Sequence, residues 1–245
     1  MSLNIRFSDL AYNAGDNVTT TTDGSAVLFD KTPPTVSEET AVPNPTNDNT
    51  SSYTFTSNEA GTITYGGSCS SSSNDNISVV GNNTITFNAL PDGTYDNCTI
   101  TVTDNASNPI TQSVTSFTID TTAPTLNEVT KVPTPTSDNT SDYTFSSDEI
   151  GTIAYGGSCS SSSNDNISVV GDNTITFNAL ADGAYSNCKI SVTDNATNTS
   201  DNLTVSEFTI GATKPALAEV TAVPNPTNDN TSNYTFFSTL SGTIN

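Results

Sequence analysis

Short stretches in which apolar and polar residues alternate run through the whole sequence. In SYTFTS (52–57), for example, the apolar Tyr53 and Phe55 alternate with Ser and Thr. A period of two is typical of a β-strand that buries one face. The same pattern predicts further strands, with Pro, Gly, Asn and Asp in the connections, at TVSEETAV, GTITYGG, NISVVG, NTITFNA, CTITVTD and a last strand ending in SFTID.

These strands predict a protein without helices. Seven short strands in about 90 residues have the size and spacing of an Ig-type Greek-key sandwich, an all-β fold. The residues opposite the apolar ones are mostly Thr, Ser and Asn, as a solvated outer face requires. The residues predicted to face inward are Tyr53, Phe55, Ile63, Tyr65, Ile85, Phe87, Ile100, Val102, Phe117 and Ile119.

The sequence repeats itself with a shift of about 90 residues. Residues 61–98 recur at 151–188 with 5 of 38 positions changed. A wider unit begins at PPTVSEETAV and returns as APTLNEVTKV and KPALAEVTAV, while the N-terminal IRFSDLAYN and VLFD align with the end of a unit. The alignment predicts an elongated array of the C-terminal part of a repeat (1–32), two complete Ig-like repeats (33–123 and 124–214) and the N-terminal part of another (215–245).

Charge and composition narrow the possible partners. The chain has 26 acidic and 5 basic residues, a formal net charge of -21. Such a field repels nucleic acid and anionic membrane surfaces and attracts cations, so nucleic acid is not an expected partner. No apolar run reaches the roughly 18 to 20 residues that cross a bilayer, so we expect no membrane insertion in this fragment, with any signal or anchor outside it.

Catalysis is not expected. Histidine is absent from the sequence. This removes the commonest general base, the Ser-His and Cys-His nucleophile systems and most zinc sites. No pair of carboxylates stands out from the turns, so we predict that the protein is not an enzyme.

Three motifs recur around the unit boundaries. A D-x-T-x-P pattern spans Asp30–Pro34 and Asp120–Pro124, D-G-x-Y spans Asp92–Tyr95, and T-D-N-A-x-N follows it. In these motifs the chain resembles the bacterial Ig-like tandem repeats of large secreted adhesins and surface proteins. The resemblance covers essentially the whole chain and implies extracellular, cell-surface stalk modules. The chain departs from the usual pattern in its two cysteines per unit, and in Gly211 at the last boundary.

Each complete unit contains two cysteines, Cys69 with Cys98 and Cys159 with Cys188. If the third and sixth strands are antiparallel neighbours, the end of one lies beside the start of the other, and each pair can form a disulfide. A redox or metal-thiolate pair is the alternative, but the chain has no C-x-x-C and no basic neighbour that would lower a thiol pKa. A disulfide implies an oxidising compartment.

The resemblance also implies calcium as a possible cofactor, bound where one sandwich meets the next. Carried over by position, the candidate ligands are Asp9 and Asp30 at the first junction, Asp104 and Asp120 at the second, and Asp194 alone at the third. Possible additional ligands are Asn13, Asn108, Asn198, Glu59, Asp148 and Glu149. The alternative interpretation is that these residues form Asx-type turns.

The leading functional interpretation is a structural stalk of an extracellular cell-surface adhesin. Its expected partners are the neighbouring repeats of the same protein, and further partners could be host or environmental surface ligands or like subunits. One alternative is a subunit of an extracellular filament, sheath or surface layer, with strand donation between the partial end repeats. A second is a carbohydrate- or protein-binding module, which should show exposed aromatic residues.

Overall fold

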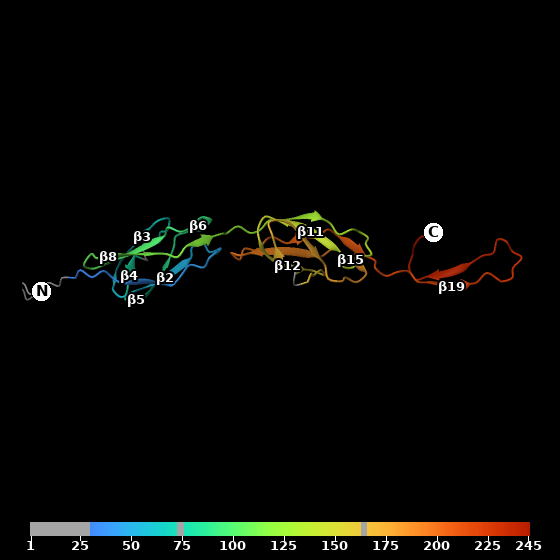
Figure 1. Ribbon diagram of the computed structural model, residues 1–245, viewed down its shortest axis with the longest axis horizontal. Coiled ribbons are helices and arrows are strands. Elements are labelled where there is room, and N and C mark those ends of the chain that lie inside the picture. The colour runs from blue at the N-terminus through green and yellow to red at the C-terminus, as the bar shows by residue number, and fades with distance from the viewer. Residues whose placement is uncertain (1–29, 73–75, 163–165) are drawn as a thin grey trace, which may run out of the picture. The chain divides into compact units, whose positions relative to one another are not determined.

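The computed structural model describes residues 30–72, 76–162 and 166–245. The chain divides into two compact units, the first ending at Thr122 and the second beginning at Ala123. Every regular element in the described residues is a β-strand (Figure 1). The all-β fold predicted from the alternating pattern is therefore confirmed, whereas the four-part division of the chain stays a prediction.

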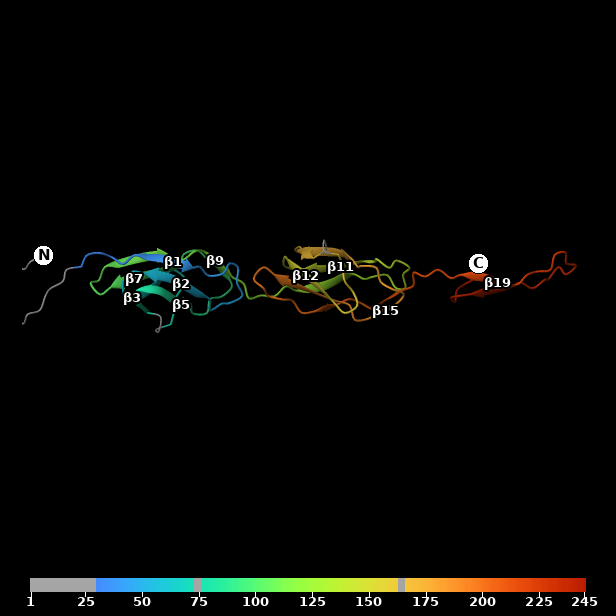
Figure 2. The ribbon, with the colours of Figure 1, turned by 90° about the horizontal axis from the view of Figure 1, so that it is seen from below.

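The first unit is a two-layer sandwich. One sheet has the order β1-β2-β5 and the other the order β4-β3-β7-β8, and all of their pairings are antiparallel (Figure 2). A short pair, β6-β9, completes the unit. The strands are β1 (Val36–Thr40), β2 (Ser52–Ser57), β3 (Gly61–Gly66), β4 (Ile77–Ser78), β5 (Gly81–Thr86), β6 (Gly93–Tyr95), β7 (Thr99–Asp104), β8 (Pro109–Ser113) and β9 (Phe117–Ile119).

The alternating pattern places apolar side chains between the sheets. Tyr53 and Phe55 of β2 have no solvent-exposed surface. Thr54, between them, points outward and its hydroxyl pairs with that of Thr84 on β5, 2.9 Å away. Cross-strand hydroxyl pairs of this kind stabilise the solvent face of a sheet. Of the ten residues predicted to face inward, nine are buried and Tyr65 is partly buried.

A row of stacked aromatic rings forms the centre of the core. Ring centroids are 6.3 Å apart for Tyr53 and Phe87, 6.0 Å for Phe87 and Phe117, and 5.3 Å for Phe117 and Tyr95. Offset aromatic contacts at such distances add to the free energy of burial. The Tyr95 hydroxyl donates to the Pro91 carbonyl oxygen at 2.7 Å, so the polar end of this buried ring is satisfied.

The second unit repeats this sandwich, with sheets β10-β11-β14 and β13-β12-β16-β17 and the pair β15-β18. The strand before the last one differs, because β17 has two residues where β8 has five. The strands are β10 (Leu126–Thr130), β11 (Asp142–Ser147), β12 (Gly151–Gly156), β13 (Ile167–Ser168), β14 (Gly171–Thr176), β15 (Gly183–Tyr185), β16 (Lys189–Asp194), β17 (Leu203–Thr204) and β18 (Phe208–Ile210).

The second unit also contains a hairpin that corresponds to β1 and β2. It consists of β19 (Leu217–Thr221) and β20 (Thr235–Ser238), paired antiparallel. Within the described residues no third strand pairs with this hairpin. Leu217 and Tyr234, whose counterparts Val36 and Tyr53 face the core, are 68% and 56% exposed.

The structure corrects two of the predicted strands and adds a third that was not predicted. NISVVG forms only the two-residue β4, and its Val79 and Val80 are exposed. The last predicted strand is two strands, β8 and β9, and β6 was not predicted. The side chain of Asn83 explains the early end of β4, because it accepts from the Val79 N–H and donates to the Val79 carbonyl, which takes over the role of a strand partner.

Candidate metal centre

Three carboxylates of the first unit lie close together. One oxygen from each of Asp30, Glu59 and Asp104 lies within 4.8 Å of the others. Asp104 is buried, Glu59 is half-buried and Asp30 is exposed. Each residue offers one carboxylate oxygen, so the cluster supplies three of the roughly six to eight oxygens that calcium takes. The donor atoms are all hard oxygens and therefore fit calcium in type.

Strand direction brings these residues together. Glu59 lies in the turn just before β3, and Asp104 is the last residue of β7. Because β3 and β7 are antiparallel, Gly61 at the start of one pairs with Asp104 at the end of the other. A Cβ atom at Gly61 would collide with the Thr103 carbonyl, so the close approach of these strands requires glycine.

Asp104 is held in place by the turn that follows it. Its Oδ1 accepts the N–H groups of Ala106 and Asn108, both at 2.8 Å, and its Oδ2 accepts from the Asn108 side-chain amide at 2.9 Å. Hydrogen bonds from Asn108, first from its backbone and then from its side chain, lower the pKa of Asp104. The carboxylate is therefore ionised and oriented before any cation arrives.

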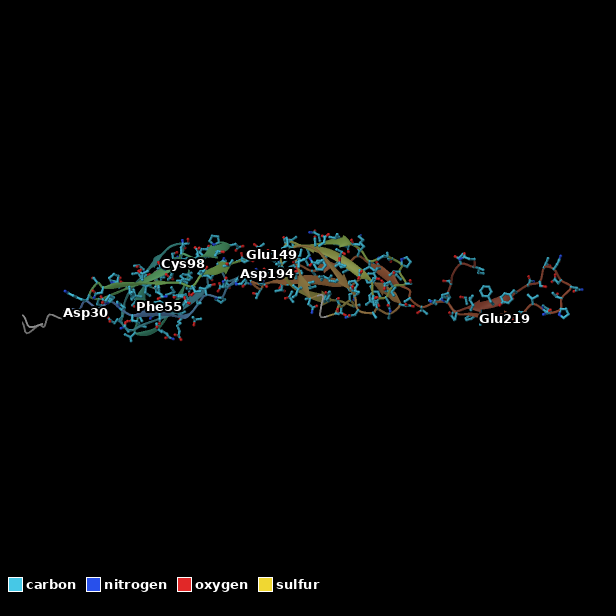
Figure 3. The ribbon with its side chains drawn as sticks, viewed as in Figure 1. Asp30, Phe55, Cys98, Glu149, Asp194 and Glu219 are labelled. Atoms are coloured by element: carbon cyan, nitrogen blue, oxygen red, sulfur yellow. A yellow bond between two sulfur atoms is a disulfide. The ribbon has the colours of Figure 1, made fainter. Side chains whose placement is uncertain are left out.

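The second unit repeats two of these carboxylates. Oxygens of Glu149 and Asp194 lie within 4.8 Å of each other, and Figure 3 shows both side chains in one place. Asp194 accepts the Asn198 N–H and side-chain amide, both at 2.9 Å, as Asp104 does in the first unit. The arrangement is thus a property of the repeat.

The structure changes the predicted grouping of the ligands. Asp104 belongs with Asp30, and the predicted pairing of Asp104 with Asp120 is wrong. Asp120 lies at the other end of the first unit, where its N–H donates to the Thr46 carbonyl at 3.0 Å. The reason is strand direction, because β7 runs back toward the end of the unit at which Asp30 lies. Asp9 and Asn13 fall outside the described residues.

Asp194, predicted to stand alone at the third junction, lies instead beside Glu149 at the start of the second unit. The turn that precedes Glu149 is fixed there, since the Thr125 N–H donates to Asp148 Oδ1 at 2.6 Å. In the partial third copy, Gly211 and Leu240 occupy the positions of Asp30 and Glu59. The two carboxylates are therefore replaced together in that copy.

The cysteines are joined in the predicted pairs. Cys69 is bonded to Cys98 and Cys159 to Cys188, each with a Cα–Cα distance of 5.2 Å. All four are buried. They extend the β3–β7 and β12–β16 pairings just beyond their last residue pairs. Two disulfides in two units indicate an oxidising, non-cytoplasmic environment.

Two further carboxylates have roles that the sequence did not reveal. Glu38 of β1 accepts the Thr115 N–H at 3.0 Å and the Thr115 hydroxyl at 2.7 Å, and burial followed by the charge of Glu38 raises the pKa of Tyr53. Asp92 accepts hydrogen bonds from Thr121 and Thr122. The available signal was repetition, because acidic residues recur at 128 and 182 in the second unit.

The described residues contain no helix long and apolar enough to span a membrane. Neither a protein-family model nor a curated protein matches the chain. Among solved structures, the chain is similar to the fibronectin(III)-like modules of Clostridium thermocellum CbhA, with a TM-score of 0.38 and 8% sequence identity. That likeness covers 72% of this chain and 94% of the other chain.

Proposed function

We propose that the chain is a run of structural spacer repeats in the stalk of an extracellular, cell-surface adhesin. The observation that carries this proposal is that the same sandwich is built twice, each time with its own closed core and its own disulfide. A module that buries its own core can be copied along a chain without redesign. The motifs shared with bacterial Ig-like repeats support the adhesin context.

The proposed role is mechanical and not catalytic. The chain lacks histidine, and carboxylates with a lowered pKa, such as Asp92 and Glu128, are engaged by the threonine and serine residues of their own unit. A general acid or base needs a free group whose pKa lies near the working pH. Lowered carboxylate pKa values favour structural over catalytic roles.

We propose calcium as the cofactor of the first unit, bound by Asp30, Glu59 and Asp104. Extracellular modules bind calcium with dissociation constants of about 0.1 to 1 mM, which suits a site of few carboxylates. The joint replacement of two of these residues by Gly211 and Leu240 in the third copy supports a shared role.

The spacer role is tested by where the protein lies and by how its units unfold. Antibodies against residues 33–214 should label intact cells of the source organism, and permeabilisation should add no signal. In the full chain, Phe117→Ala should lower the unfolding midpoint of the first unit and leave that of the second unchanged. Label seen only after permeabilisation would contradict the surface location, and a joint shift of both midpoints would contradict independent modules.

One observation favours the alternative of a laterally associating filament subunit. Ile77, Val79 and Val80 are exposed beside the edge strands β4 and β5, and the second unit repeats them as Ile167, Val169 and Val170. Exposed apolar residues at a sheet edge favour pairing with another copy. Sedimentation velocity decides, since association that rises with concentration and is abolished by Val79→Lys together with Val169→Lys would support the filament and contradict an isolated spacer.

A further inference from the structure

The segment that leaves the first sandwich is fastened to that sandwich. After β9, Asp92 Oδ1 accepts the Thr121 N–H at 3.0 Å and the Thr121 hydroxyl at 2.8 Å, while its Oδ2 accepts the Thr122 hydroxyl at 2.9 Å. The Asp120 N–H donates to the Thr46 carbonyl at 3.0 Å. The chain therefore remains attached to its own unit up to Thr122.

The segment that enters the second sandwich is fastened in a comparable way. The Thr125 N–H donates to Asp148 Oδ1 at 2.6 Å, and the Asp148 N–H donates back to the Thr125 carbonyl at 3.3 Å. Asp148 lies in the turn between β11 and β12, which belongs to the second unit. The second unit therefore holds the chain from Thr125 onward.

Only Ala123 and Pro124 lie between these two attachments. The proline ring fixes its own φ near about −65°. It also restricts the residue before it to extended conformations. Of the backbone torsions in this dipeptide, few can rotate freely.

The linker that follows β18 is also attached on both sides, but one of the acceptor groups differs. Asp182 accepts the Ala212 N–H at 2.8 Å and the Thr213 N–H at 3.1 Å. After Lys214 and Pro215, the Ala216 N–H donates to the Thr239 hydroxyl at 2.8 Å. Here too an X-Pro dipeptide is all that lies between the two attachments, although Thr239 replaces the carboxylate of Asp148.

We propose that Asp92 and Asp148 are linker clamps, positioning residues that restrict the backbone freedom between the repeats to the Ala123-Pro124 dipeptide without any bound ion. Asp182 and Thr239 do the same at Lys214-Pro215. The inference rests on the proposed spacer role and adds how a spacer limits bending at its joints. Because the clamps are hydrogen bonds within each unit, they do not depend on calcium.

The test is ¹⁵N relaxation and amide hydrogen exchange on the full chain in EDTA. In the unmodified protein we expect an order parameter near the roughly 0.85 of rigid backbone at Thr121, Thr122 and Ala123. In Asp92→Ala the order parameter of Ala123 should fall toward about 0.6 or below, which is typical of flexible backbone. Exchange at the Thr121 amide should rise on the order of tenfold, because a hydrogen bond to a charged acceptor is lost.

The matched control is Asp96→Ala, which removes the same charge from an exposed position four residues away. It should leave the Thr121 and Ala123 values unchanged. Amides of β7 should keep their protection in both variants, which separates a positioning role from general loss of the fold. If Asp92→Ala unfolds the unit, two milder variants replace it. Thr122→Val removes one hydroxyl that donates to Asp92 and should mobilise Ala123. Thr121→Ser keeps the hydroxyl at position 121 and should leave Ala123 unchanged.

Two results would overturn the clamp. One is an Ala123 order parameter below about 0.6 in the unmodified chain, and the other is an unchanged Ala123 in Asp92→Ala although Thr121 exchange has risen. Either result leaves surface labelling and independent unfolding, the tests of the spacer role, untouched. Conversely, failure of the surface labelling would remove the spacer role while the clamp measurement still stands.

Discussion

The Glu128 carboxylate accepts two hydrogen bonds from Ser206, one from its backbone N–H at 2.9 Å and one from its hydroxyl at 2.6 Å. The contact joins the first strand of the second sandwich, β10, to the segment that enters the last, β18. Tyr143 adds its hydroxyl at 3.1 Å, and Lys131 lies 3.6 Å away. Glu38 and Thr115 form the same link in the first unit. In each sandwich, one carboxylate therefore joins the first strand to the segment that precedes the last strand.

Replacing Glu128 by alanine should lower the free energy of unfolding of the second unit by about 1.5 to 3 kcal/mol, the range for a hydrogen bond to a charged group. Urea unfolding at neutral pH measures it. Glu207→Ala, which removes an exposed carboxylate next to Ser206, should change little. Equal losses in the two variants would contradict the role of the hydrogen bonds.

The same carboxylate should make stability depend on pH. Burial raises its pKa, but the hydrogen bonds from Ser206 and Tyr143 and the charge of Lys131 more than offset this, so the pKa lies below its ordinary value of 4.5. A lowered pKa contributes stability that is present above 4.5 and is lost as the pH falls through the folded-state value. Glu128→Gln should flatten this acid loss, and an unaltered pH profile would refute the assignment.

The disulfide should contribute strongly to the stability of a unit with so thin a core. Closing a loop of 29 residues stabilises a domain by about 3 to 4 kcal/mol through the unfolded chain. In the full chain, Cys69→Ser with Cys98→Ser should lower the melting midpoint of the first unit alone. Because the second unit keeps its own disulfide, calorimetry should then show two separate transitions. Reductant, which opens the second disulfide as well, should move the second transition down to the temperature of the first.

Calcium at about 1 mM should shift the backbone amide signals of Glu59 and Asp104 and raise the melting midpoint of the first unit. Glu59→Gln should weaken both effects. Glu39→Gln removes the same charge from an exposed position on β1 and should preserve them. Amide shifts equal in the two variants would indicate a diffuse cation atmosphere around a chain of charge -21 and exclude the site.

Gly61→Ala should lower the free energy of unfolding by about 1 to 3 kcal/mol, because the new methyl group meets the Thr103 carbonyl and forces β3 from β7. Gly211→Ala is the control, since an added Cβ there has no neighbour within 4 Å and its backbone lies outside the left-handed region. Chemical denaturation of both variants measures the difference. An equal cost would mean that backbone entropy and not strand approach determines the effect.

The sequence predicted the residues of long strands well, because alternation alone shows that side chains such as Tyr53 and Phe55 face the core. It predicted β6 and β8 poorly, since strands at sheet edges bury less and pattern weakly. The ligand grouping failed for a different reason. Whether Asp104 joins Asp30 or Asp120 depends on which end of the sandwich β7 reaches, and spacing along the chain does not specify direction. Glu38 accepts from a residue 77 positions away in sequence, and Asp92 from one 29 positions away. Contacts between such distant residues leave no local pattern in the sequence.

The bond between Cys69 and Cys98 has a consequence when the chain is pulled from its ends. A stretched polypeptide gains at most about 3.4 Å per residue, and the 29 residue steps from Cys69 to Cys98 are excluded from the load path. Each repeat that yields can therefore lengthen the tether by about 100 Å less than its residue count allows. Unfolding of one repeat is therefore a bounded extension, because the covalently closed loop carries no load and cannot be pulled out.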